Sequence, residues 1–119
     1  MKVPSFMLKK LYVKNSLENT DDGFRFVLKN TLMDATIVKL VTLFIDNTMI
    51  PPESVTITAA GTSWLATDIS GSNPAPMKVD VEVTIRVKGA PLKPGEHSLE
   101  IAAITREYND IRFTVTDSV

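Results

Sequence analysis

The chain has 119 residues, with 13 Lys and Arg, 14 Asp and Glu, one His and no Cys. A formal net charge of −1 gives no long-range attraction to a phosphate backbone, so we expect no nucleic-acid partner. Without Cys and with a single His, disulfides, thiolate catalysis and a multi-histidine metal site within one chain are excluded, and we expect no cofactor.

β-branched residues are abundant, since Val, Ile and Thr supply 34 of the 119 residues. Such side chains lose rotamer freedom in a helix and pack well on a pleated sheet, so the composition favours strands. A chain of this length closes one hydrophobic core by itself. We find no linker-like or repeated segment, and residues 1–119 are therefore expected to form one domain.

The beginning of the chain does not have the order of a secretion signal. Pro4 interrupts the apolar patch that includes residues 6–8. Lys9, Lys10 and Lys14 follow this patch, on the wrong side for a signal peptide. No stretch approaches the roughly 18 apolar residues that a membrane span needs. We expect the mature chain to begin at Met1, to be cytoplasmic and to have no membrane contact.

The first predicted strand covers residues 24–29, where Phe24, Phe26 and Leu28 alternate with more polar positions. This period of two is typical of a half-buried strand. Residues 19–23 form a predicted turn, so residues 11–17 are expected to form a strand that pairs across it. Residues 5–16 also have apolar side chains at helical spacing, and a helix there is the alternative.

The middle of the chain begins with residues 37–45, which are apolar on both faces and are predicted to form a central strand ending at Asp46 and Asn47. A Pro-Pro corner at residues 51–52 then leads to a short strand at residues 55–58.

Trp64 and Leu65 are predicted to form another short strand or to cover one end of the core, with a turn at residues 63–69 as the alternative. Residues 66–78 contain Gly and Pro among small polar residues and are predicted to be a loop.

The last third of the chain has the clearest alternation. Residues 79–88 alternate β-branched and mostly charged side chains without exception, which predicts a half-buried strand. Residues 91–95 have the Pro and Gly of a tight turn, and residues 97–103 and 111–116 are predicted to form a closing antiparallel hairpin. About seven to eight strands at turn-punctuated spacing predict an all-β fold, a single antiparallel two-sheet sandwich of immunoglobulin-like type.

The corner after the central strand is the candidate interface. Two apolar residues before a stiff Pro-Pro pair cannot easily all be buried, and an exposed apolar patch marks an interaction surface. Together with an open sheet edge, which can pair with another strand, this corner would bind a protein partner. The candidate interface residues are Met49, Ile50, Pro51, Pro52 and Glu53.

Aromatic side chains offer a second hypothesis. Trp64, Tyr12 and Tyr108 are residues of the kind that stack on sugars. If they lie together on the surface, the chain is a carbohydrate-binding module. Core packing is the alternative for Trp64.

His97 offers a third hypothesis, since it is the only side chain with an ordinary pKa near neutrality. Three glutamates lie in the same predicted hairpin, so the third hypothesis is a small enzyme that uses His97 and a glutamate. A structural histidine at the start of a strand is the alternative. The sequence contains no phosphate-binding loop, dinucleotide fingerprint or serine-nucleophile motif, and we predict that the chain is not an enzyme.

Several short motifs resemble known families. Residues 92–97, Leu-Lys-Pro-Gly-Glu-His, resemble the last hairpin of immunoglobulin-like modules. Residues 12–17, 22–24, 28–30 and 45–46, with the Pro-Pro-Glu of residues 51–53, are similar to a group of small archaeal all-β proteins, some of which are named hydroxymethylglutaryl-CoA reductase.

The Gly-Phe strand start, the Ile-Asp turn and the Pro-Gly-Glu-His turn also faintly resemble the small β-sandwich subunit of bacterial C-glycoside deglycosidases. In that family a companion barrel subunit holds the metal and the base, which implies an accessory role for the sandwich. Our leading prediction is therefore a non-catalytic protein that acts by association, as a homo-oligomer or as an accessory subunit.

Overall fold

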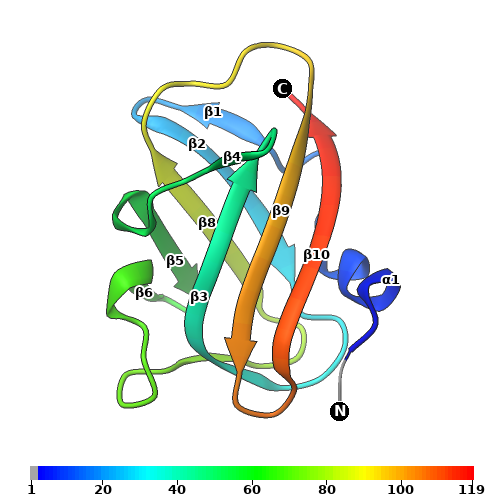
Figure 1. Ribbon diagram of the computed structural model, residues 1–119, viewed down its shortest axis with the longest axis vertical. Coiled ribbons are helices and arrows are strands. Elements are labelled where there is room, and N and C mark those ends of the chain that lie inside the picture. The colour runs from blue at the N-terminus through cyan, green and yellow to red at the C-terminus, as the bar shows by residue number, and fades with distance from the viewer. Residues whose placement is uncertain (1–2) are drawn as a thin grey trace.

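The computed structural model describes residues 3–119, apart from the side chains of Leu40 and Val41, and has two antiparallel sheets packed face to face (Figure 1). Met1, at which the sequence predicts that the mature chain begins, lies outside the described residues. The first sheet has the order β1 (Glu18–Thr20), β2 (Gly23–Lys29), β8 (Glu82–Lys88), β5 (Val55–Ala59) and β6 (Thr62–Leu65). The second has the order β10 (Asn109–Ser118), β9 (Glu96–Thr105), β3 (Ala35–Ile45) and β4 (Thr48–Met49), with β7 (Ala75–Met77) also paired to β3.

The prediction of an all-β, two-sheet antiparallel sandwich is confirmed. The described residues form ten strands instead of seven to eight, and the additional β1, β4 and β7 have only two or three residues each. Strand β3 is central as expected, since it lies between β9 on one side and β4 and β7 on the other. The predicted closing hairpin is β9 and β10, which pair along their whole length.

The core forms between the two sheets because each strand buries alternate side chains. On β5, Val55, Ile57 and Ala59 are buried while the intervening threonines are half-buried. On β8, the alternation places three β-branched residues in the core: Val83, Ile85 and Val87. The facing sheet contributes Leu43 and Ile45 from β3, Leu99 and Ile101 from β9, and Phe113 from β10.

Two hairpin turns require unusual backbone conformations. Asp46 and Asn47 have φ of 51° and 67°, which is the geometry of a two-residue turn that matches the twist of the flanking strands β3 and β4. Asp and Asn adopt this conformation more readily than most residues. Ala60 and Gly61 form the corresponding turn between β5 and β6, with φ of 52° and 80°.

The prediction of a strand at residues 11–17 was wrong. The helical alternative holds for the first part of the segment, where α1 (Ser5–Leu8) is followed by the 3-10 helix η1 (Lys9–Leu11). Only Tyr12 forms a single bridge, to Leu28, and the strand that pairs with β2 across the turn begins at Glu18. The apolar spacing of this segment buries Leu8 and packs Leu11 against the core, and that is the spacing of a helix.

The strand predicted at residues 79–88 begins later, at Glu82. Asp80 has φ of 70° and its N–H donates a hydrogen bond to the carbonyl oxygen of Asn30 at 2.7 Å, so residues 79–80 form a turn. The loop predicted at residues 66–78 contains η3 (Ala66–Asp68) as well as β7, and η3 corresponds to the turn alternative at residues 63–69.

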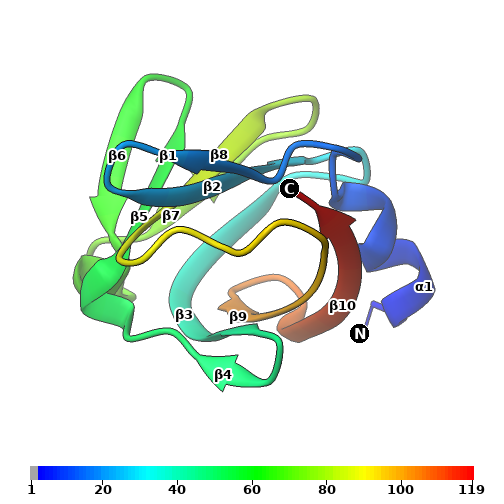
Figure 2. The ribbon, with the colours of Figure 1, turned by 90° about the horizontal axis from the view of Figure 1, so that it is seen from above.

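Helix α1 and strand β6 lie at opposite sides of the sandwich, as the view along its long axis shows (Figure 2). Helix α1 packs beside the edge strand β10. The third 3-10 helix of the described residues, η2 (Pro52–Ser54), packs against η3 and β6. The part of the chain that the structure describes contains no helix long and apolar enough to cross a membrane.

Candidate functional site

An apolar pocket of about 160 Å³ opens between the two sheets on the α1 side of the sandwich. Its deep walls are core side chains of both sheets, Ile57 and Ile85 from one and Ile101 and Phe113 from the other. Its outer walls come from the N-terminal segment and from two loops: Val3, Pro4, Met7, Leu8, Leu11, Met33 and Tyr108. The pocket therefore reaches from the surface into the core.

The pocket exists because small side chains stand where large ones would fill the space. Along the inner face of β9, Leu99 and Ile101 are followed by Ala103, and Ala35 lines the pocket from β3. Sequence reasoning missed this site, although the change from Leu and Ile to Ala along one strand face was its visible signal.

Asn30 and Thr105, two polar residues that line the pocket, are hydrogen-bonded within the protein. The Asn30 amide donates to the carbonyl oxygens of Met33 and Met77, both at 2.8 Å. The Thr105 hydroxyl donates to the carbonyl oxygen of Asn109 at 3.1 Å. Because these groups are satisfied within the protein, the pocket offers a ligand apolar contact and little polar recognition.

A different surface lies on the side of the sandwich that carries β6. We call it the β6 flank and define it by the outer edge of β6, Leu65 and the predicted interface corner. Met49 and Leu65 are exposed by 57% and 48%. Of the corner residues Met49, Ile50, Pro51, Pro52 and Glu53, only Ile50 packs against the core, and the other four are exposed. The structure thus brings the η2 part of the corner against β6, whereas Met49 lies on β4, at the edge of the other sheet.

The three aromatic residues of the sugar-stacking hypothesis are not brought together. Trp64 lies on the edge strand β6 and packs partly against the core. Tyr12 is buried at the opposite edge of the same sheet, beside β2. Tyr108 lies in the β9–β10 turn and lines the apolar pocket. These residues do not form one stacking platform.

Tyr12 ties the N-terminal segment to β10. Its hydroxyl donates a 2.6 Å hydrogen bond to Oδ2 of Asp117, which also accepts the N–H of Leu17 at 3.1 Å. Burial, followed by the contact with the Asp117 carboxylate, raises the pKa of Tyr12 well above its ordinary value. Burial alone would raise the pKa of Asp117, but the hydrogen bonds from Tyr12 and Leu17 outweigh it and lower the pKa.

His97 is buried and uses both ring nitrogens within the protein. Nδ1 lies 2.6 Å from Oδ2 of Asp46, and Nε2 lies 2.6 Å from the carbonyl oxygen of Lys93. Both partners only accept hydrogen bonds, so a doubly protonated ring satisfies both. The hydrogen bond to the Lys93 carbonyl, followed by that to Asp46, raises the pKa of His97 above 6.5.

This geometry is that of a clamp between the β3–β4 turn and the loop before β9. Asp46 also accepts the N–H of Ser98 at 2.9 Å, and the His97 bond is the main cause of its lowered pKa. His97 contacts Asp46 and not a glutamate, and it does not line the apolar pocket. Sequence reasoning missed Asp46 as its partner because the two residues lie 51 positions apart.

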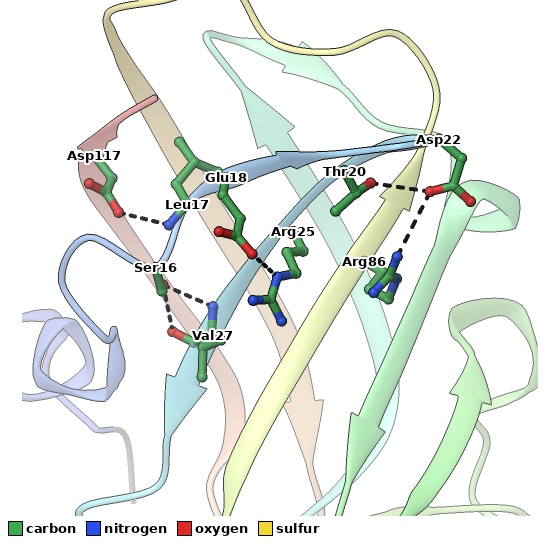
Figure 3. Close-up of polar contacts among 9 residues, drawn as sticks. All are labelled: Ser16, Leu17, Glu18, Thr20, Asp22, Arg25, Val27, Arg86 and Asp117. Atoms are coloured by element: carbon green, nitrogen blue, oxygen red, sulfur yellow. Dashed lines mark hydrogen bonds and ion pairs between the residues drawn. The ribbon is translucent and has the colours of Figure 1, made fainter.

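The outer face of the first sheet carries two arginines directly opposite each other, Arg25 on β2 and Arg86 on β8. Each faces a carboxylate (Figure 3): Arg25 pairs with Glu18, and Arg86 lies 3.9 Å from Asp22. Asp22 also accepts the hydroxyl of Thr20 at 3.1 Å. These exposed charges compensate one another across the strands, and such pairs contribute little to stability.

These observations define an all-β sandwich with an apolar pocket between its sheets, and residues 3–119 contain no cluster of three or more His, Cys, Asp or Glu that could hold a metal ion. The profile of the family described as "Hydroxymethylglutaryl-CoA reductase, N-terminal domain" matches residues 7–119, and the chain belongs to this family. No curated protein matches the chain. The family match confirms the resemblance to proteins that carry the reductase name.

Proposed function

We propose that the chain is a non-catalytic, cytoplasmic β-sandwich of immunoglobulin-like type that acts by protein association, either with copies of itself or as an accessory subunit. The observation that carries this proposal is the β6 flank, where exposed Leu65 lies on the edge strand β6 and the 3-10 helix η2 of the predicted corner contacts that strand. The faint resemblance to the sandwich subunit of C-glycoside deglycosidases supports the accessory-subunit form.

Physical chemistry favours the β6 flank as a contact surface. The edge of a sheet presents backbone N–H and C=O groups that can pair with another strand and give affinity with little demand on sequence. Exposed apolar side chains beside such an edge add the hydrophobic contribution to binding. The neighbouring η2 begins with Pro52, whose fixed φ keeps the corner rigid and lowers the entropy lost on binding.

Sedimentation velocity across micromolar concentrations tests the proposal, with pull-down of partners by the immobilised chain as a second arm. We expect Leu65→Lys to weaken self-association or partner capture at least tenfold, because it places a charge in the apolar contact. Val79→Lys is the matched control, since Val79 has a similar exposure of 46% and lies in the turn before β8, away from the β6 flank. The proposal is contradicted if the wild-type chain is strictly monomeric and, in the pull-down, recovers the same proteins as the Leu65→Lys variant.

A further inference from the structure

The apolar pocket lies on the α1 side of the sandwich, separate from the β6 flank. We propose that it binds a compact, uncharged hydrocarbon group of about six carbons, either an aromatic ring or a short branched alkyl group. Three features of the pocket carry this inference: its volume, its lining and its entrance.

The volume sets the size of the ligand. At about 160 Å³, the pocket is comparable to apolar protein cavities of about 150 Å³ that stay dry and bind benzene. A long acyl chain or a fused ring system exceeds this space. A single ring or a short branched chain fills it.

The lining sets the chemistry of the ligand. The deep walls are Ile57, Ile85, Ile101, Ala103 and Phe113, none of which can hydrogen-bond through its side chain. A charged or strongly polar group that reached these deep walls would lose its water without gaining a partner there. An uncharged hydrocarbon group makes no hydrogen bonds to water, so it gives up none when it enters the pocket.

The entrance can adapt to a ligand because two methionines lie beside it. Met7 is half-buried and Met33 is 53% exposed, and both line the pocket, whereas Met77 lines it from the buried core. Methionine has three rotatable bonds and a polarisable sulfur, which suits surfaces that receive varied apolar groups. The Tyr108 hydroxyl, 3.4 Å from the carbonyl oxygen of Asp34, links the β9–β10 turn to the β2–β3 loop beside this entrance.

NMR titration with benzene tests the inference. We expect benzene to shift the methyl resonances of Ile57, Ile85 and Ile101 and to raise the melting temperature of the protein. Naphthalene, with ten carbons, should bind at least tenfold more weakly than benzene. If benzene near its solubility limit shifts none of these methyl groups, the inference is overturned.

Ala103→Leu fills the pocket and should weaken benzene binding at least tenfold, while the variant itself melts at a higher temperature. Ala102→Leu is the matched control, because Ala102 is also buried but lies on the opposite face of β9 and does not line the pocket; it should retain binding. Ala35→Leu, at the half-buried start of β3, gives a second pocket-filling variant should Ala103→Leu not fold. The inference is contradicted if a pocket-filling variant binds benzene with the affinity of the wild-type protein.

The Leu65→Lys variant should bind benzene as the wild-type protein does. A failure of the proposal on the β6 flank can therefore be distinguished from a failure of the proposal on the pocket.

Discussion

At the scale of single residues, the His97–Asp46 contact makes folding stability depend on pH in a defined direction. The pKa of His97 is raised above 6.5, so its contribution is complete below pH 6.5 and is lost as pH rises through the folded-state pKa. The pKa of Asp46 is lowered below 3.8, so its contribution is complete above pH 3.8 and is lost as pH falls through the folded-state value. The clamp therefore stabilises the fold most between these two pH values.

An NMR titration of the imidazole checks this, and the assignment is unambiguous because the chain has one His. We expect the ring to titrate with a pKa above 6.5 in the folded protein. Asp46→Asn removes the charge that favours the imidazolium and should lower that pKa. An imidazole that titrates at or below 6.5 in the wild-type protein, or is unaffected by Asp46→Asn, rules out the clamp.

Gly23 gives a second residue-scale prediction, because a β-carbon at this position would lie 1.9 Å from the carbonyl oxygen of Val87. The neighbouring strand backbone would have to move, so Gly23→Ala should lower the free energy of unfolding by roughly 1–3 kcal/mol. Gly71→Ala is the control: nothing lies within 4 Å of its added carbon, and its effect should stay within about 0.5 kcal/mol. Urea denaturation measures both variants, and equal stabilities would contradict the close approach.

At the scale of elements, the segment before β1 shows what local pattern can and cannot predict. The strands β2, β5, β8, β9 and β10 follow from alternation, because one buried face imposes a period of two on the sequence. Residues 5–16 satisfied both a strand and a helix interpretation, and the choice depended on packing against β10. The positive φ of Asp80, which delays the start of β8, is tied to the distant Asn30 and has no local signal.

Tyr12 and Asp117 test how firmly this N-terminal segment is attached. Tyr12→Phe keeps the ring packed near Phe26, at a centroid distance of 6.1 Å, but removes the hydroxyl that donates to Asp117. We expect a loss of roughly 1–2 kcal/mol in the free energy of unfolding, as for a hydrogen bond to a charged acceptor. Tyr108→Phe removes only a 3.4 Å contact on the exposed Asp34 and should cost within about 0.5 kcal/mol. Equal effects of the two changes in denaturant titrations would show that the Asp117 bond does not hold the segment.

At the scale of the whole molecule, the candidate sites divide by how they arise. The exposure of most of the corner at residues 49–53 could be predicted, because two prolines next to apolar residues limit burial within a few positions. The apolar pocket could not, since it depends on how inner residues of β3, β5, β8, β9 and β10 face one another across the sandwich. The sequence likewise marks His97 as a candidate residue but does not reveal that Asp46, which follows β3, is its partner, because this contact forms only when distant strands pack together.

We propose that the edge of β6 pairs with a strand of another chain, and amide hydrogen exchange can detect this pairing residue by residue. The measurement compares Thr62–Leu65 in the dilute protein with the same strand in the concentrated protein or in complex with a recovered partner. Backbone amides that point away from β5 should exchange with solvent in the dilute chain and become protected on association, because they then donate to a second strand. If the protein associates and the exchange rates of these amides do not change, the contact lies elsewhere and the proposal is contradicted.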